Sequence, residues 1–152
     1  MAHTDAEARR QLLDLVAAAI EEIGVALGSL AEAYEQLDEV SADRLEEELF
    51  RPVQLAFGRA RRTHDAFADR HGLAGRTFGP AVRGAPSHGA KGFVEGAVDA
   101  AEEADALLST LQDSMLPIEF GDAELRAGLE EVRMLLSGNA GRARKFLRTL
   151  GR

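Results

Sequence analysis

The side chains best suited to metal or acid–base chemistry are the four histidines, at positions 3, 64, 71 and 88. His64 and His71 are seven residues apart, so on one helix they share a face but lie about 10.5 Å apart along the axis. A single zinc ion cannot bind both, because its bonds to nitrogen are about 2 Å long. No histidine follows a Glu by three residues, which is the spacing of di-iron bundles. We therefore expect no metal and no cofactor, and interpret the histidines as buried or half-buried side chains on a helix.

A second candidate motif is Gly84-Ala-Pro-Ser-His-Gly-Ala-Lys91, which looks like a nucleotide-binding phosphate loop at first sight. An alanine separates Gly89 from Lys91, and Gly92 stands where Ser or Thr would bind magnesium. No apolar strand precedes the segment, although the motif requires one. The serines also lack the context of a nucleophile elbow. These absences predict a non-enzymatic protein.

Small residues form a third pattern, because Gly24 and Gly28 lie one helical turn apart. Such a stripe allows two helix backbones to approach closely. A partner stripe is present at Gly96, Ala97, Ala100, Ala101 and Ala104. The stripes predict either close packing of these two helices within one chain or an interface between two copies.

The charges are divided into blocks within a net charge of −8. Residues 52–92 contain seven basic side chains and two Asp, residues 137–152 contain five basic side chains and no acid, and residues 93–116 contain six carboxylates and no Lys or Arg. The acidic total makes nucleic-acid binding an unlikely function class, although a separate basic face could attract phosphate.

Apolar spacing predicts four amphipathic helices at about residues 5–38, 42–71, 89–115 and 122–150, with a Gly-rich loop at 72–88. Spacings of three and four residues between apolar positions of the first helix are typical of a bundle seam, which includes Leu12, Val16, Ile20 and Tyr34. Low β-branched and aromatic content supports helix throughout. We predict a single all-α domain, an antiparallel up-down four-helix bundle.

Local signals predict where these helices begin, bend and end. Thr4, Ser41 and Asp122 are expected N-caps. Pro52 predicts a kink or break around residues 48–52. Gly72 followed by Leu73 predicts a helix C-terminus, and Ser137-Gly138-Asn139 predicts a break in the last helix.

Where the charge blocks lie in the folded protein depends on the direction of the third helix. If it runs antiparallel to the second, the basic segments gather at one pole of the bundle and acidic residues at the other. His3, His71 and His88 could then meet at the basic pole, where a metal or haem site is an alternative. If the long loop instead crosses the bundle, the last helix ends at the opposite pole. Twenty extended residues reach roughly 66 Å, so both arrangements are open.

No Cys is present, which excludes disulfides and thiolate metal sites and is typical of a reducing compartment. No apolar stretch approaches about 18 residues, and the N-terminus shows no signal-peptide pattern. We expect a cytoplasmic protein that does not enter a membrane.

The leading hypothesis is an interaction or scaffolding protein that self-associates, with a dimer favoured over larger assemblies and a different protein partner as a further option. Its candidate interaction residues are Gly24, Gly28, Arg61, Arg62, Arg70, Arg142, Arg144, Lys145 and Arg148. The alternative is a bundle that binds a small molecule or metal near the 72–92 loop. Its candidate ligand-binding residues are His64, Phe67, His71 and His88.

Overall fold

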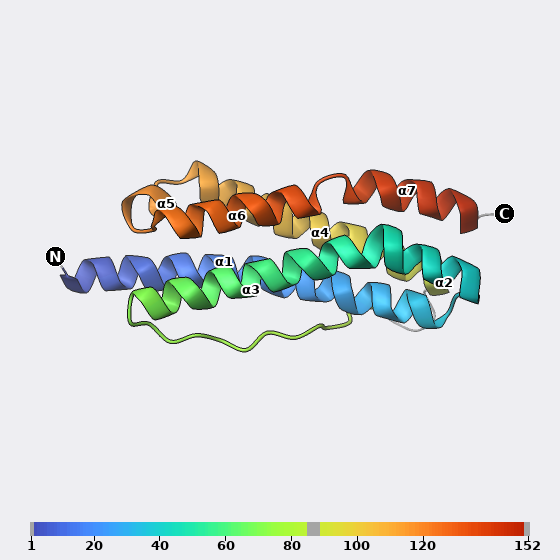
Figure 1. Ribbon diagram of the computed structural model, residues 1–152, viewed down its shortest axis with the longest axis horizontal. Helices are drawn as coiled ribbons and strands as arrows, with labels where there is room; N and C mark the ends of the chain where they lie inside the picture. The colour runs from blue at the N-terminus through green and yellow to red at the C-terminus, as the bar shows by residue number, and fades with distance from the viewer. Residues whose placement is uncertain (1, 85–88, 151–152) are drawn as a thin grey trace.

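The computed structural model describes residues 2–84 and 89–150, and all regular structure in these ranges is helical, which confirms the all-α prediction. Long helical segments lie side by side in an elongated bundle (Figure 1). In chain order these are α1 (Ala2–Glu35), α2 (Glu39–Leu45), the π-helical turn η1 (Glu46–Phe50), α3 (Arg51–Arg70), α4 (Gly89–Asp113), the short α5 (Leu116–Glu119), α6 (Ala123–Leu136) and α7 (Asn139–Leu150). Within the described residues, no helix is both long and apolar enough to cross a membrane.

The core is built on the apolar seam of α1. Leu12, Val16 and Ile20 are each fully buried. Opposite them, α4 contributes Ala97, Ala100, Ala101 and Ala104, all at most 4% exposed. These small side chains let α4 pack closely on α1, although the predicted partner stripe, Gly24 and Gly28, lies against residues 79–81 instead. Tyr34 departs from the seam pattern, because it is 37% exposed.

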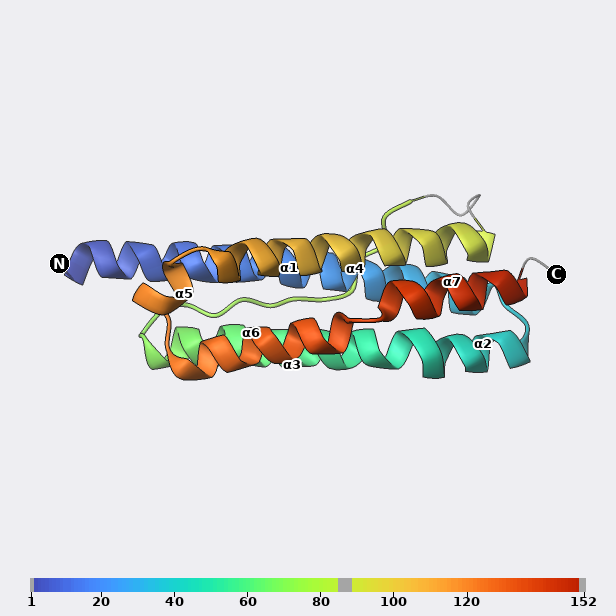
Figure 2. The same ribbon diagram turned by 90° about the horizontal axis from the view of Figure 1, so that it is seen from above.

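The helix directions differ from the predicted up-down order. Three long-range hydrogen bonds define them: Arg9 Nε to the Phe120 carbonyl, Arg70 Nε to Asp122 Oδ2, and Arg133 Nε to Asp105 Oδ1. The second of these joins the end of α3 to the start of α6, so these two helices are antiparallel. Since α4 and α6 form a hairpin, α4 runs parallel to α3 rather than antiparallel to it (Figure 2).

α4 runs parallel to α3 because of the segment 71–84 that follows α3, which we call the crossover. It leaves the end of α3 and runs in extended form back along the bundle (Figures 1 and 2). About 14 extended residues can span roughly 46–50 Å. Phe78 packs partly buried against the core, and the Ala81 N–H donates to the Gly24 carbonyl at 3.1 Å. The long loop is therefore a crossover, and α4 begins at the opposite end of the bundle from the end of α3.

Two helix ends follow the local sequence signals. At the end of α3, Gly72 adopts φ +67°, which costs glycine little, and the Leu73 N–H donates to the Ala68 carbonyl at 2.8 Å. Leu73 then packs against the core. At the start of α6, the Asp122 carboxylate accepts from the Leu125 N–H at 2.8 Å. The break between α6 and α7 lies at residues 137–138, as predicted.

Two predicted N-caps are wrong. α1 begins at Ala2, so Thr4 is inside the helix rather than at its boundary. α2 begins one turn before Ser41, because Asp38 caps it and accepts from the Ser41 N–H at 2.8 Å. These hydrogen bonds to Ser41 lower the pKa of Asp38. A carboxylate at Asp38 competes better than the Ser41 hydroxyl for the free N–H groups of a helix start.

The irregularity predicted near Pro52 takes the form of the π-turn η1, directly before α3. Proline lacks an N–H and clashes with the preceding helical turn. In the structure it lies in the first turn of α3, directly after the π-turn, across which the Arg51 N–H donates to the Glu46 carbonyl. The extra residue of a π-turn changes which side chains face the neighbouring helix, and such turns are frequent at functional sites.

Candidate functional site

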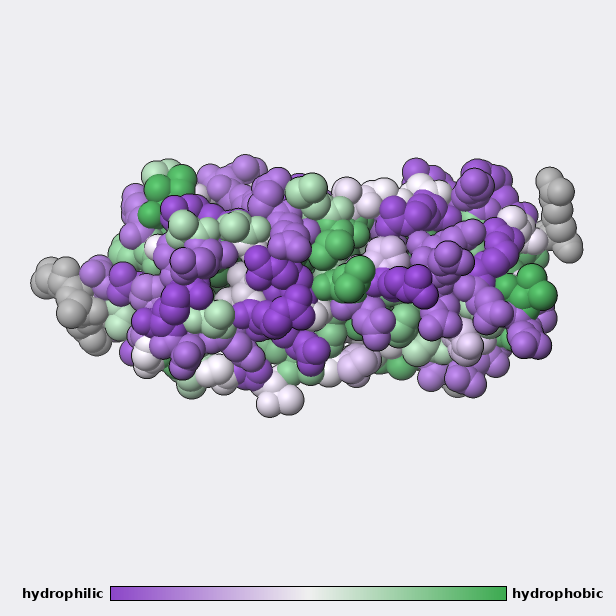
Figure 3. Space-filling model, in the orientation of Figure 1, coloured by the Kyte–Doolittle hydropathy of each residue, from purple (hydrophilic) through white to green (hydrophobic). Residues whose placement is uncertain are grey.

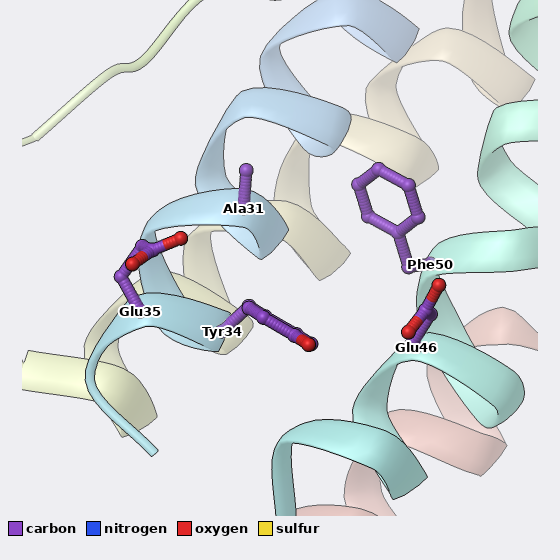
Figure 4. A pocket seen from close by; sticks show the side chains of 5 residues that line it. All are labelled: Ala31, Tyr34, Glu35, Glu46 and Phe50. Carbon is purple, nitrogen blue, oxygen red and sulfur yellow. The ribbon is translucent and has the colours of Figure 1, made fainter. Parts of the chain in front are cut away.

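The candidate site is a crevice between the last turns of α1 and η1. It has a volume of about 200 Å³ and is lined by Ala31, Tyr34, Glu35, Glu46 and Phe50. Tyr34 extends from α1 toward η1, and Glu46 and Phe50 face it from η1 (Figure 4). Phe50 is half-buried against the core, whereas Glu46 is exposed. We call this site the acidic crevice.

The electrostatics of the acidic crevice favour a cation. Neither Glu35 nor Glu46 forms an ion pair with any residue in the described ranges. The last turn of α1 also contains no basic residue, so the negative end of its helix dipole is not offset there. Two unpaired carboxylates and a helix C-terminus therefore face solvent around one small opening.

The aromatic rings add a second contribution to cation binding. A guanidinium or ammonium group is attracted to the face of a Tyr or Phe ring by about 0.5–1 kcal/mol at an exposed site. Pockets for drug-sized ligands usually measure about 300–1,000 Å³, so this smaller crevice suits the tip of one cationic side chain.

Sequence reasoning missed this site because Tyr34 fits the seam of α1. The signal that could have found it is the only tyrosine of the chain, directly before Glu35. The opposite wall depends on the π-turn, for which Pro52 predicts the place but not the form. The crevice is thus a product of packing α1 against η1.

The basic run of α7 lies at the same end of the molecule as the acidic crevice (Figure 1). Arg142 Nε donates to the Glu48 carbonyl at 3.1 Å and so ties α7 to η1. Arg144, Lys145 and Arg148 are exposed, and none of them forms an ion pair with a described residue. We call these three side chains the α7 basic patch.

Of the two arrangements that were left open, the structure has the one in which the basic segments do not share a pole. Arg61, Arg62 and Arg70 are on the later part of α3, whereas the α7 basic patch is at the opposite end of the bundle. Arg61 stacks over the Phe57 ring at 4.7 Å, and both Arg61 and Arg62 line an open groove of about 640 Å³ beside the crossover. Arg70 is occupied by Asp122 at 2.8 Å. The crossover separates the two basic segments because it reverses the direction assumed for α4 and everything after it.

The interface predicted at Gly24 and Gly28 is also corrected. Both residues are buried within the single chain. A Cβ at Gly24 would lie 2.9 Å from the Gly79 carbonyl oxygen, and one at Gly28 would overlap the Ala81 carbonyl. The glycines accommodate the crossover backbone, so they offer no surface to a second copy.

Of the predicted ligand-binding residues, the structure describes His64, Phe67 and His71, and the two histidines contact different carboxylates. His64 is 1% exposed, with Nδ1 2.9 Å from Asp65 Oδ1 and its ring 5.2 Å from that of Phe78. Phe67 is buried against the His71 ring, at 4.4 Å between centroids. His88 lies outside the described residues. Among the residues that are described, no group of three or more His, Cys, Asp or Glu side chains is arranged to hold a metal ion.

His71 instead belongs to a polar cluster that joins α3 to α6. Its Nε2 lies 3.1 Å from Asp122 Oδ2, which also accepts from Arg70 Nε at 2.8 Å. Burial alone would raise the pKa of Asp122, but hydrogen bonds from Arg70, the Leu125 N–H and His71 outweigh it and lower the pKa to about 2. This arrangement is structural, because every group in it already has a partner.

Comparison with known proteins gives no functional assignment: no protein-family model, curated protein or solved structure matches the chain.

Proposed function

We propose that this chain is a non-enzymatic, cytoplasmic interaction protein that forms a homodimer through the end of the bundle containing η1 and α7. One observation carries the proposal: the acidic crevice and the α7 basic patch are both unpaired and share that end. Each has the chemistry that the other requires.

The shared location favours a closed dimer over an open chain. In a two-fold interface, residue i of one copy contacts residue j of the other, and j contacts i. A single end that contains both members of a complementary pair can form both contacts at once. If the crevice and the basic patch were at opposite ends, the copies would associate head to tail. Such association continues into filaments unless the copies close into a ring.

The proposed contact inserts Lys145 or Arg148 of one copy between Tyr34 and Phe50 of the other. A planar or compact cation fits the aromatic walls, and Glu35 and Glu46 supply the opposite charge. Exposed apolar side chains could add buried area, since Val40 of α2 is 71% exposed. The face seen in Figure 3 is mostly hydrophilic, with hydrophobic side chains near its middle and toward both ends.

Replacement of Glu46 by Gln is expected to weaken the dimer roughly tenfold, because one charge-assisted contact per copy is lost. Sedimentation equilibrium at low ionic strength measures the dissociation constant. The matched control is Glu119→Gln on α5, which removes the same charge at the other end of the bundle. Equal weakening in both variants would show that only net charge matters and would contradict the proposed contact.

Salt gives a second readout on the wild-type protein. Exposed charge pairs weaken once the Debye length falls, from about 8 Å at 0.15 M to about 3 Å at 1 M salt. The proposal predicts that the dimer dissociates as salt rises. A dimer that tightens with salt would indicate an apolar interface elsewhere on the molecule.

A further inference from the structure

The cavity beneath the start of the crossover has a chemistry of its own, separate from the acidic crevice. It has a volume of about 280 Å³ and lies among α1, α3 and the crossover. Its charged and polar wall consists of Arg10, Asp14, His64 and Arg76, and Leu13 and Leu73 make it partly apolar. We call it the His64 cavity.

His64 is the unusual member of this wall. It is 1% exposed, and its Nε2 is buried without a hydrogen-bond partner among the described residues. The Asp65 carboxylate can only accept, so Nδ1 carries the proton that it shares with Asp65. In the neutral ring, Nε2 is then an acceptor. A buried acceptor without a donor is destabilising, and a ligand that supplies the donor removes this cost.

The charges of the wall point to an anion. Two guanidinium groups and one carboxylate line the cavity, but Arg76 is also paired with Glu21, so Arg10 is the cation of this lining that has no counter-charge among the described residues. Arg10 is exposed and forms no ion pair with a described residue, so its donors are available to a ligand. Arg76 already contacts Glu21 at 2.9 Å and lies 4.0 Å from Asp14, and it stacks over Phe78. A carboxylate would therefore be held first by Arg10, with Arg76 closing over it.

We propose that the His64 cavity binds a small hydroxycarboxylate. Its carboxylate would pair with Arg10 and Arg76, and its hydroxyl would donate to His64 Nε2. A zwitterionic amino acid also has a donor, but its ammonium group would lie close to the guanidinium groups of Arg10 and Arg76, which repel it. Residues 74 and 75, which line the cavity, are exposed, so the cavity lies at the surface of the molecule.

The test uses the full chain labelled with ¹⁵N in its histidine rings, titrated separately with lactate, propionate and alanine. Lactate is expected to shift the His64 Nε2 resonance and to bind about tenfold more tightly than propionate, which has the same charge but no hydroxyl. Alanine is expected to bind more weakly than lactate. Equal affinity for lactate and propionate would overturn the proposed donor to His64, and no binding of any of the three would overturn the site.

Variants outside the core separate binding from folding, because a change at His64 itself could unfold the bundle. Arg10→Gln is expected to weaken lactate binding by about tenfold or more while leaving the thermal midpoint nearly unchanged. The control is Arg51→Gln, an exposed arginine at the start of α3 that does not line the cavity. If both variants bind lactate as the wild type does, the cavity is not the site. Dimerisation should be unaffected by either change, so this result is independent of the interface.

Discussion

Gly28→Ala is expected to lower the free energy of unfolding by about 1–2 kcal/mol, although alanine is the better helix former. The added Cβ would overlap the backbone carbonyl of Ala81, and forcing extra volume into a packed site costs about 1–3 kcal/mol. The higher helix propensity of alanine offsets less than about 1 kcal/mol of this cost. Urea unfolding followed by circular dichroism measures the difference.

Gly96→Ala is the matched control for this prediction. Gly96 lies within α4, and a Cβ there would meet no atom within 4 Å. The same substitution should therefore stabilise the protein by up to about 1 kcal/mol. If Gly28→Ala stabilises the chain as much as Gly96→Ala does, the crossover does not lie on α1 as described.

Asp122→Asn is expected to destabilise the protein by about 2 kcal/mol at neutral pH and to remove part of its acid sensitivity. The pKa of Asp122 is about 2 in the folded chain and 3.8 in its ordinary range. A carboxyl with a lowered pKa contributes stability that is fully present above the ordinary value and disappears as pH falls through the folded value. The 1.8-unit difference corresponds to about 2 kcal/mol, lost between about pH 4 and pH 2.

The measurement is the unfolding free energy of wild type and variant at several pH values from 7 to 2. The difference in unfolding free energy between the two proteins should be constant above about pH 4.5. It should shrink toward pH 2, as the wild-type carboxyl also becomes neutral. Asp113→Asn, an exposed acid at the end of α4, should stay close to the wild type at every pH. A gap that does not shrink at low pH would mean that the Arg70–Asp122–His71 cluster is held by geometry rather than charge.

Local sequence signals predicted the parts of this fold that depend on neighbours in the chain. The seam of α1, the Gly72–Leu73 helix end and the Asp122 cap each involve residues within a few turns of one another. The small residues of α1 were noticed but assigned to the wrong neighbour, because Gly24 and Gly28 contact the crossover and not α4. These signals predict which face of each helix is buried and where the helix ends.

The direction of α4 depends on contacts that no local signal encodes. A loop of this length can turn back or cross the bundle at similar cost in chain entropy. The choice is made by distant groups, because Gly24 and Gly28 leave room for the crossover backbone and Phe78 packs beneath it. Once the crossover is in place, α7 must end beside η1, and the acidic crevice and basic patch come to share one end.

The most direct test of this account is native mass spectrometry of two charge-reversed variants, alone and mixed. One variant carries Glu35→Lys and Glu46→Lys in the crevice, and the other carries Lys145→Glu and Arg148→Glu on α7. Each alone places like charges across the proposed contact in both directions and should be monomeric. Mixed together, the positive crevice meets the negative helix and the native crevice meets the native helix, so a one-to-one heterodimer should form. A mixture that stays monomeric, or either variant dimerising alone as well as the wild type does, would contradict the account.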